Sequence, residues 1–134
     1  MSNFDIGETL LSRACECYDD MIRAYERRSW GMVVRRAQEV VETSLKGLLK
    51  MMGVEYPKSH HVGEVFRRVC IEKGLKIDSD QLDEFEDISS YLAEERAPAF
   101  YMEKIYSKQN ADKAKTDAEN VLNFARSFAT TLEN

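Results

Sequence analysis

Arg96 and Tyr101, separated by four residues, are the pair whose side chains best suit the binding of an anion or a nucleotide. An arginine guanidinium stays charged and can form paired hydrogen bonds with phosphate. A tyrosine ring can stack on a base or hydrogen-bond to it. The structural alternative is that Arg96 pairs with a neighbouring carboxylate, Glu94 or Glu95, and that Tyr101 belongs to the core. Residue types alone favour this alternative.

His60 and His61 suggest a metal site, but adjacent side chains diverge. No HExxH pattern or carboxylate at i,i+4 completes a ligand set, so we predict no metal. The segment is better interpreted as the start of a helix, with Ser59 or His61 as the cap and Glu64 as the partner in a capping box.

Acidic residues are dense in the second half of the chain, and we interpret them as a water-facing helix surface rather than a cation site. They are Asp83, Glu84, Glu86, Asp87, Glu94 and Glu95. The sequence contains no glycine-rich phosphate loop, GxSxG or kinase pattern. Conventional enzyme classes are therefore not supported, and we predict no cofactor.

The element that must position these side chains is a helix predicted from Trp30 to Met52, where apolar residues recur at three- and four-residue spacing. The hydroxyl of Ser29 is expected to cap its start, and Gly53 to end it in a left-handed conformation. Its opposite face is expected to meet water or a partner. That face carries Arg35, Arg36, Gln38, Glu39, Glu42, Lys46 and Lys50.

Four more helices are predicted, over about residues 5–27, 62–73, 79–96 and 110–132. Ser79 or Asp80 is expected to cap the fourth, and Pro98 to end it near Arg96, because the residue before a proline avoids the helical region. Segment 97–109 should be irregular, with Phe100, Tyr101 and Tyr106 packed on the bundle or on another subunit. The predicted fold is all-α, an up-and-down four-helix bundle core with about five helices, in a single domain over residues 1–134.

Composition limits the function further. A net charge of −5 and a pI near 5.1 argue against a broad basic surface for nucleic acid, but leave room for a local basic site. Cys15, Cys17 and Cys70 are an odd set without a CxxC motif, so we expect reduced thiols and a cytoplasmic protein. The first residues lack a basic start followed by an apolar run, so we expect no signal peptide, and no window is apolar enough to predict a membrane span.

Several features resemble the HEPN family, the "higher eukaryotes and prokaryotes nucleotide-binding" domains. Segment 36–49, followed by Gly53, Pro57 and His60, resembles the opening signature of the family. Arg96 resembles the start of its arginine motif, and Tyr106 follows. The alanine-rich final helix is also similar, with Ala111, Ala114, Ala118, Glu119, Val121 and Leu122.

The resemblance implies a helical bundle that commonly forms homodimers and often works beside a nucleotidyltransferase in toxin–antitoxin or related modules. Ribonuclease members carry an arginine, four to six residues and then a histidine, and cut RNA without metal at the dimer cleft. Here Arg96 matches the arginine, but Tyr101 stands where the histidine is expected. A tyrosine, with an ordinary pKa of about 10 against about 6.5 for histidine, is a poor base at neutral pH.

We therefore predict a HEPN-like nucleotide- or RNA-binding protein, a cytoplasmic homodimer working with a nucleotidyltransferase partner, without strong catalysis of its own. The expected ligand-binding residues are Arg96, Tyr101 and His60. One alternative is a metal-independent endoribonuclease toxin with Arg96 and Tyr101 as catalytic residues, or with His60 brought near by folding. Another is a structural adaptor whose polar helix face docks a protein.

Overall fold

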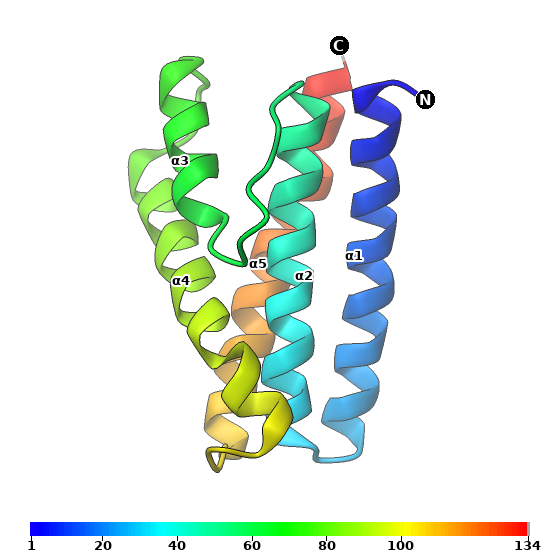
Figure 1. Ribbon diagram of the computed structural model, residues 1–134, viewed down its shortest axis with the longest axis vertical. Helices are drawn as coiled ribbons and strands as arrows, with labels where there is room; N and C mark the ends of the chain where they lie inside the picture. Colours follow the sequence, from blue (N-terminus) through cyan, green and yellow to red (C-terminus); the bar gives the residue numbers. More distant parts are fainter. Residues whose placement is uncertain (134) are drawn as a thin grey trace.

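The computed structural model describes residues 1–133 and shows five α-helices and no strand in that range (Figure 1). The all-α prediction is therefore confirmed. The helices are α1 (Asn3–Glu26), α2 (Trp30–Met51), α3 (Gly63–Glu72), α4 (Ser79–Tyr101) and α5 (Lys108–Glu133).

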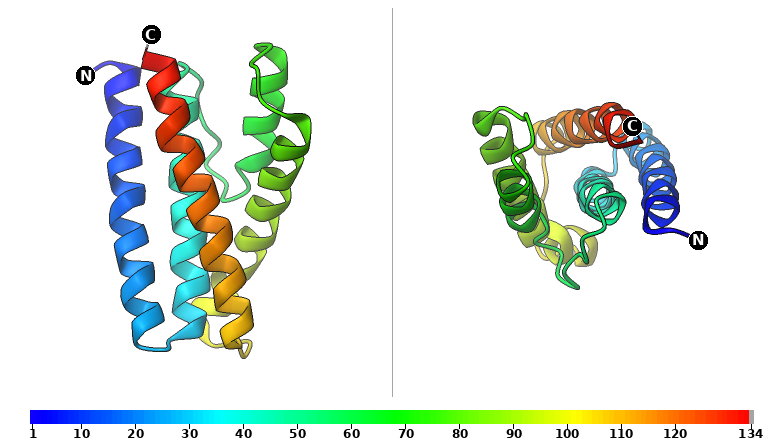
Figure 2. Two further views of the ribbon diagram at one scale, coloured as in Figure 1. Left: turned by 180° about the vertical axis from the view of Figure 1, so that it is seen from behind. Right: turned by 90° about the horizontal axis from the view of Figure 1, so that it is seen from above.

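The central element is α2, which contacts each of the other four helices. Seen along the bundle axis, α2 lies between α1, α5 and α4, and α3 packs against α4 (Figure 2). The apolar stripe predicted from its spacing is buried: Val33, Val34, Ala37, Val40, Val41, Leu45, Leu48 and Leu49 are at most 1% exposed. Burial of large apolar side chains contributes about 1.5–3 kcal/mol each, so α2 supplies much of the core.

An aromatic cluster fills the space between α5 and the α3–α4 pair. The ring of Phe124 on α5 lies 5.0 Å from that of Phe85 on α4 and 6.3 Å from that of Phe66 on α3. Phe128 stacks on Phe124 at 5.3 Å. Large rings therefore connect helices whose backbones stand too far apart for small side chains to meet.

The helix ends only partly follow the predicted caps. Gly53 takes the expected left-handed conformation, with φ of 76°. Ser29 precedes α2, but its hydroxyl makes no capping bond, so that prediction was wrong. At α3 neither Ser59 nor His61 acts as the cap; the hydroxyl of Ser89 on α4 instead accepts a hydrogen bond from the Gly63 amide at 2.9 Å. A tertiary contact thus replaces the local one.

The start of α4 also differs from the prediction, because the cap is neither Ser79 nor Asp80. The side chain of Asp78 accepts the Asp80 amide at 2.9 Å. An aspartate ahead of the first turn also suits the positive end of the helix.

The end of α4 differs more, because the helix continues through Pro98 to Tyr101. A proline inside a helix lacks a backbone donor and its ring crowds the carbonyl four residues earlier, but here the surrounding contacts hold the last turn in place. Arg35 on α2 donates a hydrogen bond to the Arg96 carbonyl at 3.2 Å. Buried Ala99 packs closely on Gly31 of α2. A Cβ added to Gly31 would lie only 2.9 Å from the Ala99 carbonyl oxygen. Tertiary contacts therefore override the proline signal.

The loop after α4 is shorter than predicted, since α5 already begins at Lys108. Ser107 and Asn110 form reciprocal hydrogen bonds between side chain and backbone at this start, at 2.9 and 3.1 Å. Tyr106 is buried, as expected, whereas Phe100 and Tyr101 are exposed. No helix among residues 1–133 has an apolar stretch long enough to cross a membrane.

Candidate functional site

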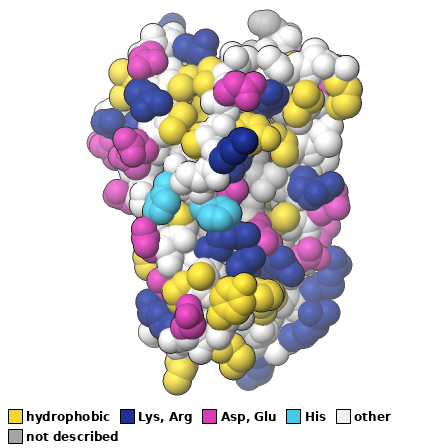
Figure 3. Space-filling model, viewed as in Figure 1, with side chains coloured by type: hydrophobic (Ala, Val, Ile, Leu, Met, Phe, Trp, Pro, Cys, Tyr) yellow, Lys and Arg dark blue, Asp and Glu magenta, His cyan; other side chains and the backbone are white. Residues whose placement is uncertain are grey.

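His60, Arg96 and Tyr101 line one hollow of about 300 Å³. The fold brings these three predicted residues together from the α2–α3 connection and the last turns of α4. The other residues that line this hollow are Arg35, Ala93, Glu94 and Ala97. We call it the Arg96 hollow. Figure 3 shows both histidines in the middle of this face, with Lys and Arg side chains next to them.

The Arg96 guanidinium points to α2 and not to its own helix. Its NH1 donates to Gln38 Oε1 at 2.7 Å and lies 3.8 Å from Glu39 Oε2. The suggested pairing with Glu94 or Glu95 is wrong: Glu94 lies 3.3 Å from His61 Nε2, and Glu95 is bonded to Lys104 and Tyr106. The Arg96 side chain remains 25% exposed, so it can still reach a ligand.

Gln38 links Arg96 to Glu42. Its side-chain oxygen accepts from the guanidinium, while its nitrogen donates to Glu42 Oε1 at 2.7 Å. This amide orientation suits both partners, because a guanidinium only donates and a carboxylate only accepts. Gln38 is 2% exposed, so the predicted water-facing surface of α2 is buried at this point.

Glu42 holds His60 from the other side. His60 Nδ1 lies 2.6 Å from Glu42 Oε1, and Lys46 Nζ donates to Glu42 Oε2 at 2.8 Å. Burial raises the pKa of Glu42, but the hydrogen bonds from Lys46, Gln38 and His60 outweigh it and leave the pKa below its ordinary value. An ionised Glu42 requires the proton on His60 Nδ1, which leaves Nε2 of the neutral ring able to accept a proton.

Glu39 is shared by three arginines. Its carboxylate lies 3.4 Å from Arg35, 2.7 Å from Arg36 and 3.8 Å from Arg96. The hydrogen bond to Glu39 raises the pKa of Arg36. One negative charge cannot compensate three positive ones, so excess positive charge surrounds Glu39 beside the Arg96 hollow, where an anion could neutralise it. Of the three arginines, Arg35 and Arg96 line the hollow itself.

Aromatic side chains line the other edge of the site. The Arg35 guanidinium lies 4.7 Å above the Phe100 ring, and Phe100 meets Tyr101 edge to face at 5.0 Å. Tyr101 is 68% exposed, so its ring is free to stack on a planar group. The core alternative for Tyr101 is therefore wrong.

Sequence reasoning missed Gln38, Glu39 and Glu42 as partners of the predicted residues. A signal was present, since Gln38, Glu42 and Lys46 recur every four residues and so share one helix face. What the sequence could not show was that Arg96, 58 residues after Gln38, would lie against that face.

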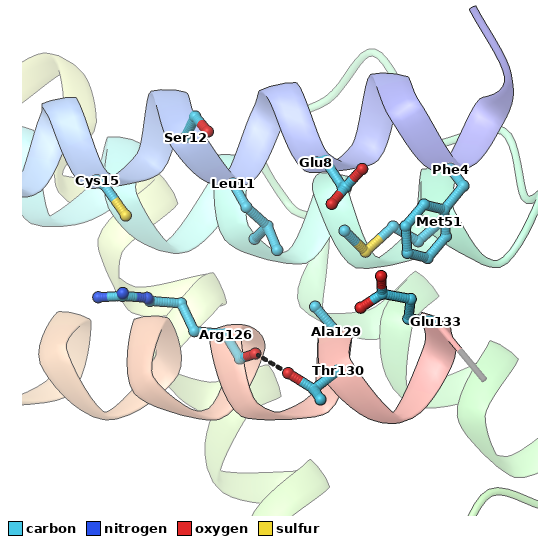
Figure 4. A pocket seen from close by; sticks show the side chains of 10 residues that line it. All are labelled: Phe4, Glu8, Leu11, Ser12, Cys15, Met51, Arg126, Ala129, Thr130 and Glu133. Carbon is cyan, nitrogen blue, oxygen red and sulfur yellow. Dashed lines mark hydrogen bonds between the residues drawn. The ribbon is translucent and has the colours of Figure 1, made fainter.

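A second hollow, of about 330 Å³, lies between α1 and α5. Figure 4 shows the side chains of Glu8, Arg126 and Glu133 along this groove, with Cys15 near one end. Within residues 1–133 these three charged side chains form no ion pair with one another or with other residues, and all are exposed. We call this hollow the α1–α5 groove; it contains none of the predicted site residues.

The structure agrees with the interpretation of the cysteines as free thiols. Cys15 and Cys17 are partly buried and Cys70 is fully buried. Burial raises the pKa of Cys70 to about 11. Among the residues described, no group of three or more histidine, cysteine, aspartate or glutamate side chains could hold a metal ion.

Comparison with known families identifies a helical family for this chain. The family model of the HEPN domain matches residues 8–128, which include all five helices in whole or in part. The chain belongs to the HEPN family. Membership of this family supports a role related to nucleotides or RNA in general. Searches of the curated proteins and of solved structures gave no significant match.

Proposed function

We propose that this HEPN domain binds a nucleotide or RNA in the Arg96 hollow, without strong catalysis of its own. The observation that carries the proposal is a hollow lined by Arg35, Arg96 and an exposed tyrosine ring, next to a carboxylate, Glu39, that three arginines share. The guanidinium of Arg96 would bind phosphate, and Tyr101 would stack on the base.

The proposal includes a homodimer and a nucleotidyltransferase partner in a toxin–antitoxin-like module, as the family resemblance implies. Exposed apolar side chains next to the site support an interface: Phe100, Tyr101, Met102 and Ile105 are 45%, 68%, 88% and 96% exposed. Clusters of this kind mark interaction surfaces on soluble domains. Gel filtration at micromolar protein tests the dimer, and a monomer-only profile contradicts it.

Calorimetric titration with uridine monophosphate tests the ligand site. Arg96→Ala is expected to weaken binding about ten- to a hundredfold, because a hydrogen bond to a charged group contributes about 1.5–3 kcal/mol. Arg126→Ala, which removes an arginine from the α1–α5 groove, is the matched control and should bind like the wild type. Absence of any Arg96-dependent heat favours the structural adaptor and overturns the proposal.

A second candidate function, metal-independent RNA cleavage, is favoured by one observation: His60, whose Nδ1 contacts Glu42, lines the same hollow as Arg96. His60 could take the proton of a ribose 2′-hydroxyl as its oxygen attacks the phosphorus. The bond to the 5′-oxygen then breaks, and that oxygen takes up a proton from Tyr101 or from water. Arg96 would stabilise the extra negative charge on the phosphate.

Incubation of structured RNA with the protein and a chelator separates the two functions. Cleavage by the wild type that is lost in both His60→Ala and Arg96→Ala supports the ribonuclease. Intact RNA in the presence of wild-type protein that binds uridine monophosphate leaves the binding function alone.

A further inference from the structure

A second basic hollow adjoins the site. Arg23, Arg27 and Arg36 line a depression of about 240 Å³ at the junction of α1 and α2, together with Asp20 and Ser29. Arg23 and Arg27 lie one turn apart on one side of the chain, about 6 Å along the α1 axis. This depression lies outside the hollow that holds His60 and Tyr101.

Glu39 joins the two hollows. Its carboxylate contacts Arg36, which lines the second hollow, and also Arg35 and Arg96, which line the first. Five arginines thus form one continuous basic surface, which we call the arginine band: Arg23, Arg27, Arg35, Arg36 and Arg96. Figure 3 shows dark-blue side chains that extend from below the histidines towards α1 at the lower right.

The arginine band is positively charged although the whole chain carries −5. Only two carboxylates, Asp20 and Glu39, form ion pairs with its five arginines in the part of the chain described. Arg27 is exposed and has no ion pair within residues 1–133. The band therefore has three more positive charges than its partner carboxylates compensate.

Arginines at intervals along a surface match a ligand with phosphates at intervals. A mononucleotide carries its phosphate at one place and could occupy only one of the two hollows. A single strand could place one nucleotide against Tyr101 and Arg96, and its next phosphates against Arg36, Arg23 and Arg27. The aromatic edge at one end also favours a nucleic acid over an acidic peptide, because bases stack on it.

We propose that the arginine band binds the successive phosphates of a single-stranded RNA, one nucleotide of which occupies the Arg96 hollow. This inference rests on the proposed function and adds the direction in which the strand leaves the site. It also predicts that affinity grows with strand length and falls steeply with salt, since each phosphate contact releases counterions.

Fluorescence anisotropy with a labelled oligouridylate of about ten nucleotides, within the usual site size for single strands, tests the proposal over a series of salt concentrations. Each phosphate contact contributes about 0.7 to the slope of log affinity against log salt. Arg23→Ala with Arg27→Ala is expected to lower this slope by about 1.4 and to leave the affinity for uridine monophosphate unchanged. If the double variant fails to fold by circular dichroism, Arg27→Ala alone should lower the slope by about 0.7.

The matched control is Arg68→Ala with Lys73→Ala, which removes two exposed positive charges from the far end of α3 and should keep the wild-type slope. If the variant without Arg23 and Arg27 keeps the wild-type salt slope and still binds uridine monophosphate, RNA binding along the arginine band is contradicted. The proposed function of the Arg96 hollow then still stands. Oligouridylate binding that depends on Arg23 and Arg27 but not on Arg96 overturns the proposed function and, with it, the placement of one nucleotide in the Arg96 hollow. Polyglutamate that binds more tightly than the oligouridylate indicates an acidic protein partner instead.

Discussion

The Arg96 hollow and the α1–α5 groove have nearly the same volume, about 300 and 330 Å³, and both contain arginine and glutamate. They differ in how those groups are held. In the Arg96 hollow the charged side chains are hydrogen-bonded across α2, α4 and the connection between α2 and α3. In the groove, Glu8, Arg126 and Glu133 are each exposed and form no ion pair within residues 1–133.

The difference shows that volume and residue type do not define a candidate site. Exposed charged side chains must lose rotamer freedom before they bind a ligand, and this ordering costs free energy. Side chains that neighbours already hold in one rotamer lose little further freedom when a ligand binds. The Arg96 hollow is therefore prepared for a ligand, whereas the groove is not.

The largest difference between the two hollows is expected from Gln38→Leu, which cuts the link between Arg96 and Glu42. Arg96 and Glu42, which are both partly buried, each lose a hydrogen bond, so the free energy of unfolding should fall by about 1–3 kcal/mol. Ser12→Ala, at an exposed residue of the groove, is the control and should change it by less than about 0.5 kcal/mol. Urea denaturation measures the free energy of unfolding of both variants. Equal values would contradict the expected difference between the Arg96 hollow and the groove.

A smaller, pH-dependent effect is expected from Glu42→Gln. The pKa of Glu42 lies below its ordinary value of 4.5 in the folded protein, so its stabilising effect is present above about pH 4.5 and is lost as the pH falls through the folded pKa. At pH 7 the wild type should have the higher free energy of unfolding, by roughly 1 kcal/mol. The two values should converge in acid. Glu8→Gln, at an exposed carboxylate in the groove, is the control. A wild-type advantage that stays constant from pH 7 into acid would show that the carboxylate charge is not its source.

The smallest expected effect is a chemical one at the groove. Cys15 lines the groove and should react first with a thiol reagent at neutral pH. Burial, together with nearby Glu39, raises the pKa of Cys17, and burial alone raises that of Cys70 to about 11, so both should react more slowly. Single Cys→Ser variants assign the reactions. Bound uridine monophosphate should not protect Cys15, and protection would place the ligand in the groove.

The sequence predicted the helices well because their apolar spacing is a local property. It failed at positions where a distant contact decides the outcome. Pro98 is a strong local signal for the end of a helix. Contacts with Arg35 and Gly31 nevertheless stabilise the turn of α4 that follows it. Ser59 is a reasonable local cap for α3. The first amide of α3, that of Gly63, instead donates its hydrogen bond to the hydroxyl of Ser89 on α4.

The candidate site shows the same division. Arg96, Tyr101 and His60 could be named from residue type and family resemblance, and the fold places them in one hollow. Their partners could not be named, because Gln38, Glu39 and Glu42 read as an ordinary polar helix face. Only the packing of α4 on α2 turns that face into the wall of a site.

The two adjacent histidines have a further consequence for access. His60 reaches Glu42 on α2, and His61 reaches Glu94 on α4, so successive residues of one connection hold two different helices. The position of this connection beside the Arg96 hollow therefore depends on two imidazole–carboxylate contacts at the surface. A change confined to this connection would thus alter one wall of the Arg96 hollow, which His60 lines, without a substitution in the apolar core.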